Sequence, residues 1–75
     1  GMVIQVSDQV LFGVEQYERM VDILSDGLRS RGSMKVTEVK ELIPASRKYI
    51  LAFLEHLDRR GITQRNEDVR TLKKG

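Results

Sequence analysis

The sequence predicts a small α+β domain in which three helices precede a C-terminal β-hairpin. Three observations support this prediction. Apolar residues recur at helical spacing in three successive segments, Gly32, Pro44 and Gly61 separate or end these segments, and two short segments of strand character follow the last glycine. The 75 residues are enough for one domain with a modest core.

The first part of the chain combines a short apolar run with a long amphipathic segment. The run at residues 10–13 predicts an entry strand or a segment packed on the core. The amphipathic segment predicts a helix from about residue 15 to residue 30, which Gly32 ends. Its apolar members recur at spacings of three and four, namely Tyr17, Met20, Val21, Leu24 and Leu28.

Two further helices are predicted on either side of Pro44. The shorter one is expected to start at Thr37, whose hydroxyl can cap free N–H groups while Glu38 suits the helix dipole. Pro44 cannot extend that helix, so the chain turns, and Ser46 is placed to cap the next helix, which Gly61 ends. The apolar stripes are Val39, Leu42 and Ile43 in the shorter helix and Ile50, Phe53, Leu54 and Leu57 in the longer one.

The C-terminal segment has the pattern of a hairpin. Residues 62–65 and 69–72 predict two short strands around a polar turn at residues 66–68, and Lys35-Val36 is predicted to add a third strand. Helix, short helix, turn, helix and hairpin is the order of a winged helix. We therefore predict a three-helix helix-turn-helix core with a C-terminal β-hairpin wing.

The domain boundary is predicted near residue 10. Gly1-Met2 resembles the scar of a removed tag, so we expect residues 1–9 to be a tag scar and an N-terminal extension. Residues 10–75 are expected to form a single, monomeric winged-helix domain, which is either an excised domain or a very small protein. Lys73-Lys74-Gly75 is predicted to be a frayed tail.

The composition argues against catalysis. The chain has no Cys and one His, and His56 is predicted to be solvated on the polar side of its helix. We find no phosphate-binding loop and no Ser/His/acid constellation, so we predict no catalytic residue, no metal and no cofactor. No apolar run is long enough to cross a bilayer, and we predict a cytoplasmic location without a membrane partner.

Positive charge is concentrated in the last thirty residues. Residues 1–45 hold five Lys/Arg and seven Asp/Glu, and residues 46–75 hold eight and four, so the net charge changes from −2 to +4. Arg47 and Lys48 stand in the first turn of a predicted helix, where the dipole favours negative charge. This breach of a local rule points to an anionic ligand such as nucleic-acid phosphate.

The predicted fold gives these cations a common location. In a helix-turn-helix, the N-terminal residues of the second helix meet the nucleic acid, which here are Ser46, Arg47 and Lys48. Arg65 and Arg70 project from the two predicted wing strands and can lie on one face beside that helix end. These five residues are the predicted binding site.

Two motifs carry a resemblance to a known family. They are S-R-K-Y at residues 46–49 and L-E-x-L-D-R-x-G-x-T at residues 54–63. With them, residues 34–72 resemble the C-terminal winged-helix domain of the bacterial selenocysteine-specific elongation factor. The resemblance implies RNA binding through Ser46, Arg47 and Lys48 in the helix and through Arg65 and Arg70 in the wing.

The resemblance also implies partners. The direct partner would be the selenocysteine insertion hairpin of messenger RNA, which tethers the factor and its charged transfer RNA near the ribosome. The parent factor's other domains, the ribosome and selenocysteyl-tRNA would be indirect partners in translation elongation. The parent's GTPase centre would lie on a part of the chain that is not present here.

The wing departs from the family pattern at two positions. Glu67 stands before Asp68 where the family often has Gly, and Gln64 stands where an Arg is frequent. Because Glu resists the positive φ that Gly tolerates, we expect a different turn at the wing tip and weaker or differently aimed wing contacts.

Two other functions remain open from the sequence. A DNA-binding winged helix would use the same helix in a major groove, although such domains commonly dimerise. A protein-interaction module would instead show an exposed apolar patch on the helix or wing surface.

Overall fold

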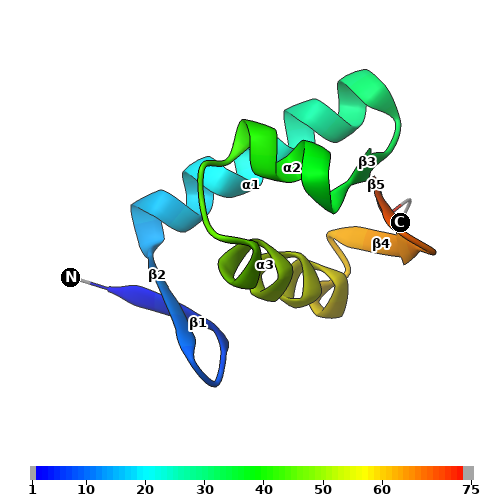
Figure 1. The fold of residues 1–75 in the computed structure, drawn as a ribbon. Coiled ribbons are helices and arrows are strands. Elements are labelled where there is room, and N and C mark those ends of the chain that lie inside the picture. Colours follow the sequence, from blue (N-terminus) through cyan, green and yellow to red (C-terminus); the bar gives the residue numbers. More distant parts are fainter. Residues whose placement is uncertain (1, 74–75) are drawn as a thin grey trace.

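The computed structural model describes residues 2–73 and has the predicted α+β winged-helix architecture. The elements, in chain order, are β1 (Val3–Ser7), β2 (Val10–Gly13), α1 (Val14–Arg31), β3 (Met34–Lys35), α2 (Val36–Leu42), α3 (Arg47–Arg60), β4 (Thr63–Asn66) and β5 (Val69–Leu72) (Figure 1). The Gly1 of the predicted tag scar and Lys74-Gly75 of the predicted frayed tail lie outside the described residues.

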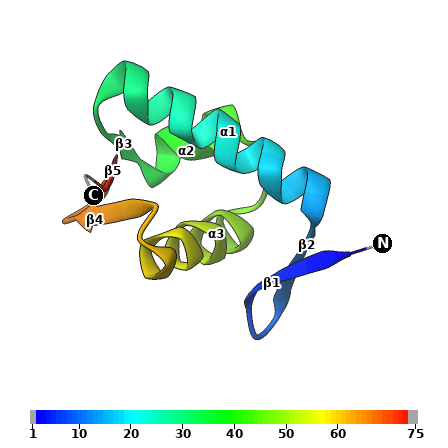
Figure 2. The ribbon, with the colours of Figure 1, turned by 180° about the vertical axis from the view of Figure 1, so that it is seen from behind.

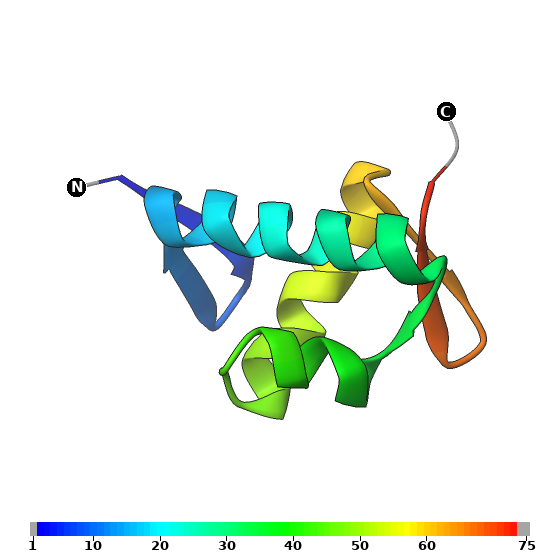
Figure 3. The same ribbon diagram turned by 90° about the horizontal axis from the view of Figure 1, so that it is seen from above.

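The helices form the centre of the molecule and the two sheets lie at its ends. α1 extends from the β1–β2 hairpin at one end to β5 at the other (Figures 2 and 3). α3 packs against both α2 and β4. The wing, formed by β4 and β5, therefore lies against the helical core on the side away from the N-terminal hairpin.

The wing belongs to an antiparallel three-stranded sheet with strand order β3-β5-β4. The predicted third strand exists, but it is Met34–Lys35 rather than Lys35-Val36, because Val36 is the first residue of α2. The register pairs Arg65 with Arg70 and Met34 with Arg70. The register thus places the two wing arginines directly opposite each other.

The N-terminal segment is packed, which corrects the predicted boundary at residue 10. That boundary falls between two paired strands, β1 and β2. Val6 is 1% exposed in the core, and the Arg59 Nη2 donates a hydrogen bond to the Val6 carbonyl at 2.8 Å. Residues 3–9 are therefore part of the folded unit, because the hairpin buries its apolar side against the helices.

The predicted helical stripes form the core. Ile50, Phe53, Leu54 and Leu57 of α3 are each 0% exposed, and Met20, Leu24 and Leu28 of α1 are also buried. The rings of Phe12 and Tyr17 meet Phe53 edge to face, at centroid distances of 6.1 and 5.8 Å. This packing of α1 and β2 onto α3 fixes the direction of the helix that carries the predicted site.

The helix ends follow the prediction, except that neither Thr37 nor Ser46 makes the predicted side-chain cap. Gly32 and Gly61 end α1 and α3 with φ values of 84° and 76°, which glycine adopts without a Cβ penalty. Thr37 does not cap α2, because β3 leads straight into that helix and places Lys35 at the cap position. There the Glu38 carboxylate accepts a hydrogen bond from the Lys35 backbone N–H at 3.1 Å.

His56 is not a free, solvated side chain, which corrects the prediction. It is half-buried, shares a 3.1 Å hydrogen bond with the Tyr17 hydroxyl and meets the Tyr17 ring edge to face. Burial lowers the pKa of His56 below its usual value of 6.5, and the nearby charges of Arg60 and Arg59 lower it further. The neutral imidazole is therefore the form that fits this site.

This shift predicts a pH dependence of stability. Because the unfolded chain binds the His56 proton more tightly than the folded domain does, the free energy of unfolding falls as the pH falls below 6.5 and through the folded-state pKa. We expect urea unfolding between about pH 5.5 and pH 7.5 to show this loss. In His56→Gln, which removes the chain's only histidine, the loss within this window disappears. An unchanged profile would assign the dependence to other groups.

Candidate nucleic-acid interface

A cleft of about 290 Å³ lies between the start of α2, one face of α3 and the wing. We call it the basic cleft; its lining residues are Lys35, Val36, Thr37, Arg47, Leu51, Glu55, Arg65, Asp68 and Arg70. It brings together three of the five predicted site residues, Arg47, Arg65 and Arg70. Ser46 and Lys48 do not line it, but both are exposed beside it at the start of α3.

One wall of the basic cleft is a single row of α3. Arg47, Leu51 and Glu55 are spaced by four residues, so they lie above one another on the same helix face. The fully buried stripe of α3 lies roughly 110° around the helix axis from this row. Core packing therefore directs this row outward, and it presents a cation, an apolar side chain and a carboxylate in that order.

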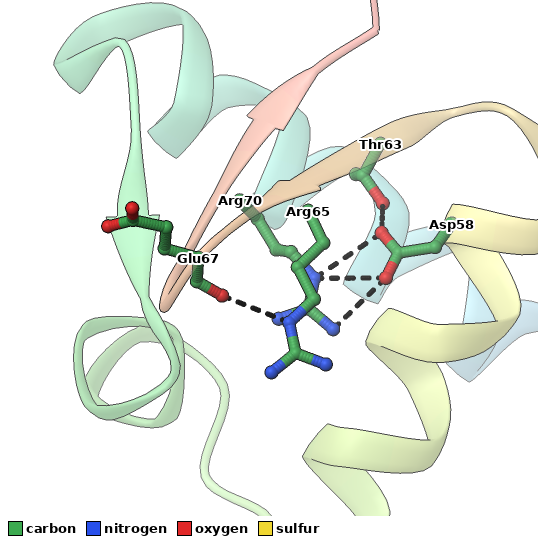
Figure 4. A network of polar contacts seen from close by, with 5 residues as sticks. All are labelled: Asp58, Thr63, Arg65, Glu67 and Arg70. Atoms are coloured by element: carbon green, nitrogen blue, oxygen red, sulfur yellow. Dashed lines mark hydrogen bonds and ion pairs between the residues drawn. The ribbon is translucent and has the colours of Figure 1, made fainter.

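The wing supplies the facing cations. Because Arg65 and Arg70 are paired across β4 and β5, their side chains project from the same face of the wing (Figure 4). Arg65 is exposed, and its Nε donates a hydrogen bond to the Glu67 carbonyl at 3.0 Å. This bond orients the Arg65 side chain, and within residues 2–73 its terminal nitrogens form no hydrogen bond or ion pair.

Arg70, which was predicted to project from the wing as a binding residue, is buried and paired. It is only 3% exposed, and its Nη2 and Nε each lie 3.0 Å from Oδ2 of Asp58 (Figure 4). The Thr63 hydroxyl donates to the same carboxylate at 2.6 Å. Asp58 therefore neutralises Arg70, which joins the wing to α3 and forms the floor of the basic cleft.

The exposed cations at the cleft and at the start of α3 are not neutralised by close ion pairs. Lys35 Nζ lies 3.9 Å from a carboxylate oxygen of Asp68, a loose and exposed pair that connects β3 with the wing tip. Arg47 and Lys48 form no ion pair within the described range. The first turn of α3 also has no acidic residue.

The start of α3 leaves its backbone donors open. Ser46 occupies the predicted cap position, but its side chain makes no capping hydrogen bond. The first N–H groups of α3 are thus not satisfied by that side chain, and the helix dipole adds positive potential there. Uncapped donors, Arg47 and Lys48 together favour an anion at this helix end.

The wing tip has a left-handed residue at Glu67, although Glu was expected to resist a positive φ there. Glu67 has φ 60° and is the first of two residues between Asn66 and Val69, which pair with each other. A positive φ at this position is what the tight hairpin turns that match strand twist require. The geometry of the hairpin therefore outweighs the reluctance of Glu to adopt it.

We expect Glu67→Gly to raise the free energy of unfolding by about 1 kcal/mol, because Gly adopts this conformation without the steric cost of a Cβ. Urea unfolding would measure the gain. Asn66→Gly is the control. Asn66 lies in β4 and does not have a positive φ, so replacing it by Gly should lower the free energy of unfolding by about 0.5–1 kcal/mol. A loss of stability in Glu67→Gly would contradict strain at the turn.

Sequence reasoning missed several parts of the basic cleft. Lys35 enters it from β3 and Asp68 from the turn of the wing, and the register that brings the two together cannot be read from a local pattern. Leu51 and Glu55 could have been found, because they follow Arg47 at helical spacing on the exposed side of α3. The pairing of Asp58 with Arg70 had no signal in the sequence.

The described residues contain neither a membrane span nor a metal cluster. None of the helices within residues 2–73 combines the length and apolar character that crossing a membrane requires. The same residues include no group of three His, Cys, Asp or Glu side chains placed to hold a metal ion. The groups that line the basic cleft are therefore cations, apolar side chains and two carboxylates.

The fold and the cleft define this chain as a winged-helix domain with a basic surface between α3 and its wing. Residues 26–72 match the family model described as "Elongation factor SelB, winged helix". The match covers more than half of the chain, so the chain belongs to the SelB winged-helix family, which confirms the resemblance.

A solved structure agrees with this assignment at the level of the fold. The chain is similar to the mRNA-binding domain of elongation factor SelB from E. coli, determined in complex with SECIS RNA, with a TM-score of 0.86 and 19% sequence identity over 99% of this chain. This chain spans 61% of the length of that one. No curated protein sequence matches it.

Proposed function

We propose that this domain binds the selenocysteine insertion hairpin of messenger RNA, as an RNA-binding module of a selenocysteine-specific elongation factor. One observation carries the proposal: Arg47 of α3 and Arg65 of the wing line one basic cleft in a member of the SelB winged-helix family. The SECIS RNA bound to the similar E. coli domain supports the choice of ligand.

The mechanism is recognition without chemistry. A-form RNA hides base edges in a deep, narrow groove, so proteins read sequence mainly at loops and bulges where bases are splayed out. Arg47 and Arg65 would clamp the backbone from the two walls of the cleft, and Ser46, Lys48 and the open N–H groups would hold a flanking phosphate. Arg70 would act mainly from the floor, by holding the wing against α3.

The module would serve a larger machine. Bound to the hairpin, it would tether the parent factor and its selenocysteyl-tRNA near the ribosome in the cytoplasm, while the GTPase centre lies elsewhere in the parent. One hairpin requires only one copy of the domain, so we propose that it acts as a monomer.

The apolar surface favours RNA over the protein-interaction alternative. That alternative predicts an apolar patch on the helix or wing surface. Among the described residues, the large apolar side chains with the greatest exposure are Met2, Val3 and Leu11, at the N-terminal hairpin and far from the wing. On α3 only Tyr49 joins them, at 43% exposed, and its ring packs edge to face on Phe12.

A binding titration tests the proposal. The ligands are the selenocysteine insertion hairpin from the same organism, a hairpin with a scrambled loop, and duplex DNA, each at two salt concentrations. We expect tight binding to the intact loop only, with an affinity that falls by roughly two to four powers of the salt concentration if three to five phosphates are contacted. Equal weak binding to all three would contradict loop recognition, and tighter binding to the DNA would favour the DNA-binding alternative.

A further inference from the structure

The basic cleft contains a carboxylate that phosphate binding does not explain. Glu55 is exposed on the cleft wall and, within residues 2–73, makes no hydrogen bond or ion pair. The other lining carboxylate, Asp68, has Lys35 beside it at 3.9 Å. An unpaired negative charge repels an RNA backbone, so a surface used only for phosphate would be better without Glu55.

The position of Glu55 suggests what it can meet. It lies eight residues after Arg47 on the same face of α3, which is about 12 Å along the helix axis. Leu51 lies between them and, with Val36 across the cleft, offers apolar surface to a flat ring. The cleft volume of about 290 Å³ is at the small end of ligand pockets and suits one base rather than a duplex.

The chemistry of the carboxylate narrows the choice of base. An ionised Glu only accepts hydrogen bonds, and its two oxygens can accept two parallel ones. The pairing edge of guanine carries two adjacent donors, N1–H and the N2 amino group. Adenine, cytosine and uracil each present a single donor group with at least one acceptor beside it, which a carboxylate repels.

We propose that Glu55 is a specificity-determining residue that accepts two hydrogen bonds from the pairing edge of one unpaired guanine in the RNA loop. Arg47 and Arg65 hold the flanking backbone, and Leu51 contacts the plane of the base. This inference rests on the proposed function, because it requires an RNA loop in the basic cleft.

A selection experiment tests the inference without knowledge of the natural hairpin. The probe is a library of RNA hairpins with a fixed stem and a randomised loop, selected on the intact domain and sequenced. The wild-type protein is expected to enrich guanine at one loop position. In Glu55→Gln, whose amide offers one acceptor and one donor, that enrichment disappears while selection for the remaining loop positions persists.

The matched control is Glu18→Gln on α1. Glu18 is also exposed and loses the same charge, but it does not line the basic cleft, so its guanine enrichment should equal that of the wild type. If Glu55→Gln keeps the guanine enrichment, the inference is wrong and the proposed function stands. If the wild-type protein selects no loop sequence, the proposed function is wrong, and the inference is wrong with it.

A second test measures whether Glu55→Gln binds one selected hairpin more tightly or more weakly than the wild-type protein does. If Glu55 only borders the RNA, Glu55→Gln removes repulsion and tightens binding. The inference instead predicts a loss of about tenfold, within the range for a good bidentate base contact. Inosine in place of the selected guanine lacks the N2 amino group, so it should weaken wild-type binding and leave Glu55→Gln nearly unaffected. Tighter binding by Glu55→Gln, or equal inosine effects in both proteins, would overturn the inference.

Discussion

Asp58→Asn is expected to lower the free energy of unfolding by about 2–4 kcal/mol, most of the stability available to a domain of this size. The reason is the Arg70 guanidinium, which is 3% exposed and receives its compensating charge from Asp58. Breaking a buried ion pair from one side typically costs about 3–5 kcal/mol. The expected loss is smaller here because Asp58 is 22% exposed and Asn keeps one acceptor oxygen.

Urea unfolding measures this effect, and the chain offers a matched control. Asp26→Asn breaks the pair with Arg29, whose side chains are 75% and 65% exposed, and should cost under about 1 kcal/mol. Replacing Arg70 by Met together with Asp58→Asn removes the orphaned charge and should recover part of the loss. Equal small losses for Asp58→Asn and Asp26→Asn would mean that the buried pair contributes little.

The same pair connects stability with the binding site. Asp58 lies on α3 and Arg70 lies on β5, directly opposite Arg65 of β4. The ion pair therefore fixes the angle between the wing and α3, and with it the distance across the basic cleft. Asp58, which does not line the basic cleft, thus determines where Arg65 can reach.

The helices and the wing strands could be predicted because their signals are local. The α3 stripe needs only the spacing of Ile50, Phe53 and Leu57, and the helix ends need only a glycine able to adopt positive φ. The packing of β1 was missed because it depends on pairing with β2 and on the contact between Val6 and Arg59. Such contacts between distant residues leave no period in the sequence.

The binding-site residues could likewise be predicted only where their signal is local. Arg47 and Lys48 could be found because cations in a first turn contradict a rule that acts within one helix. The different roles of Arg65 and Arg70 could not be found, because both are arginines on one wing face and only the position of Asp58 separates the buried one from the exposed one. Burial of a long cation is decided by its partner, not by its own segment.

Arg47→Ala is expected to weaken binding to the selenocysteine insertion hairpin by about 1–3 kcal/mol, roughly 5–150-fold. Arg47 is exposed in the first turn of α3 and lines the basic cleft, where its planar guanidinium can hold a phosphate or a base edge with two hydrogen bonds. A titration at several salt concentrations should also give a salt dependence that is lower by about one unit. Arg47→Lys keeps the charge and should recover only part of the affinity.

Lys48→Ala separates a contact in the cleft from simple charge. Lys48 is the next residue, is also exposed in the same helical turn and carries the same charge, but it does not line the basic cleft. Long-range attraction to RNA falls by a similar amount in both variants, so any larger loss in Arg47→Ala measures what the cleft adds. Equal losses for both would mean that affinity follows net charge alone, and would contradict a specific contact between Arg47 and the RNA.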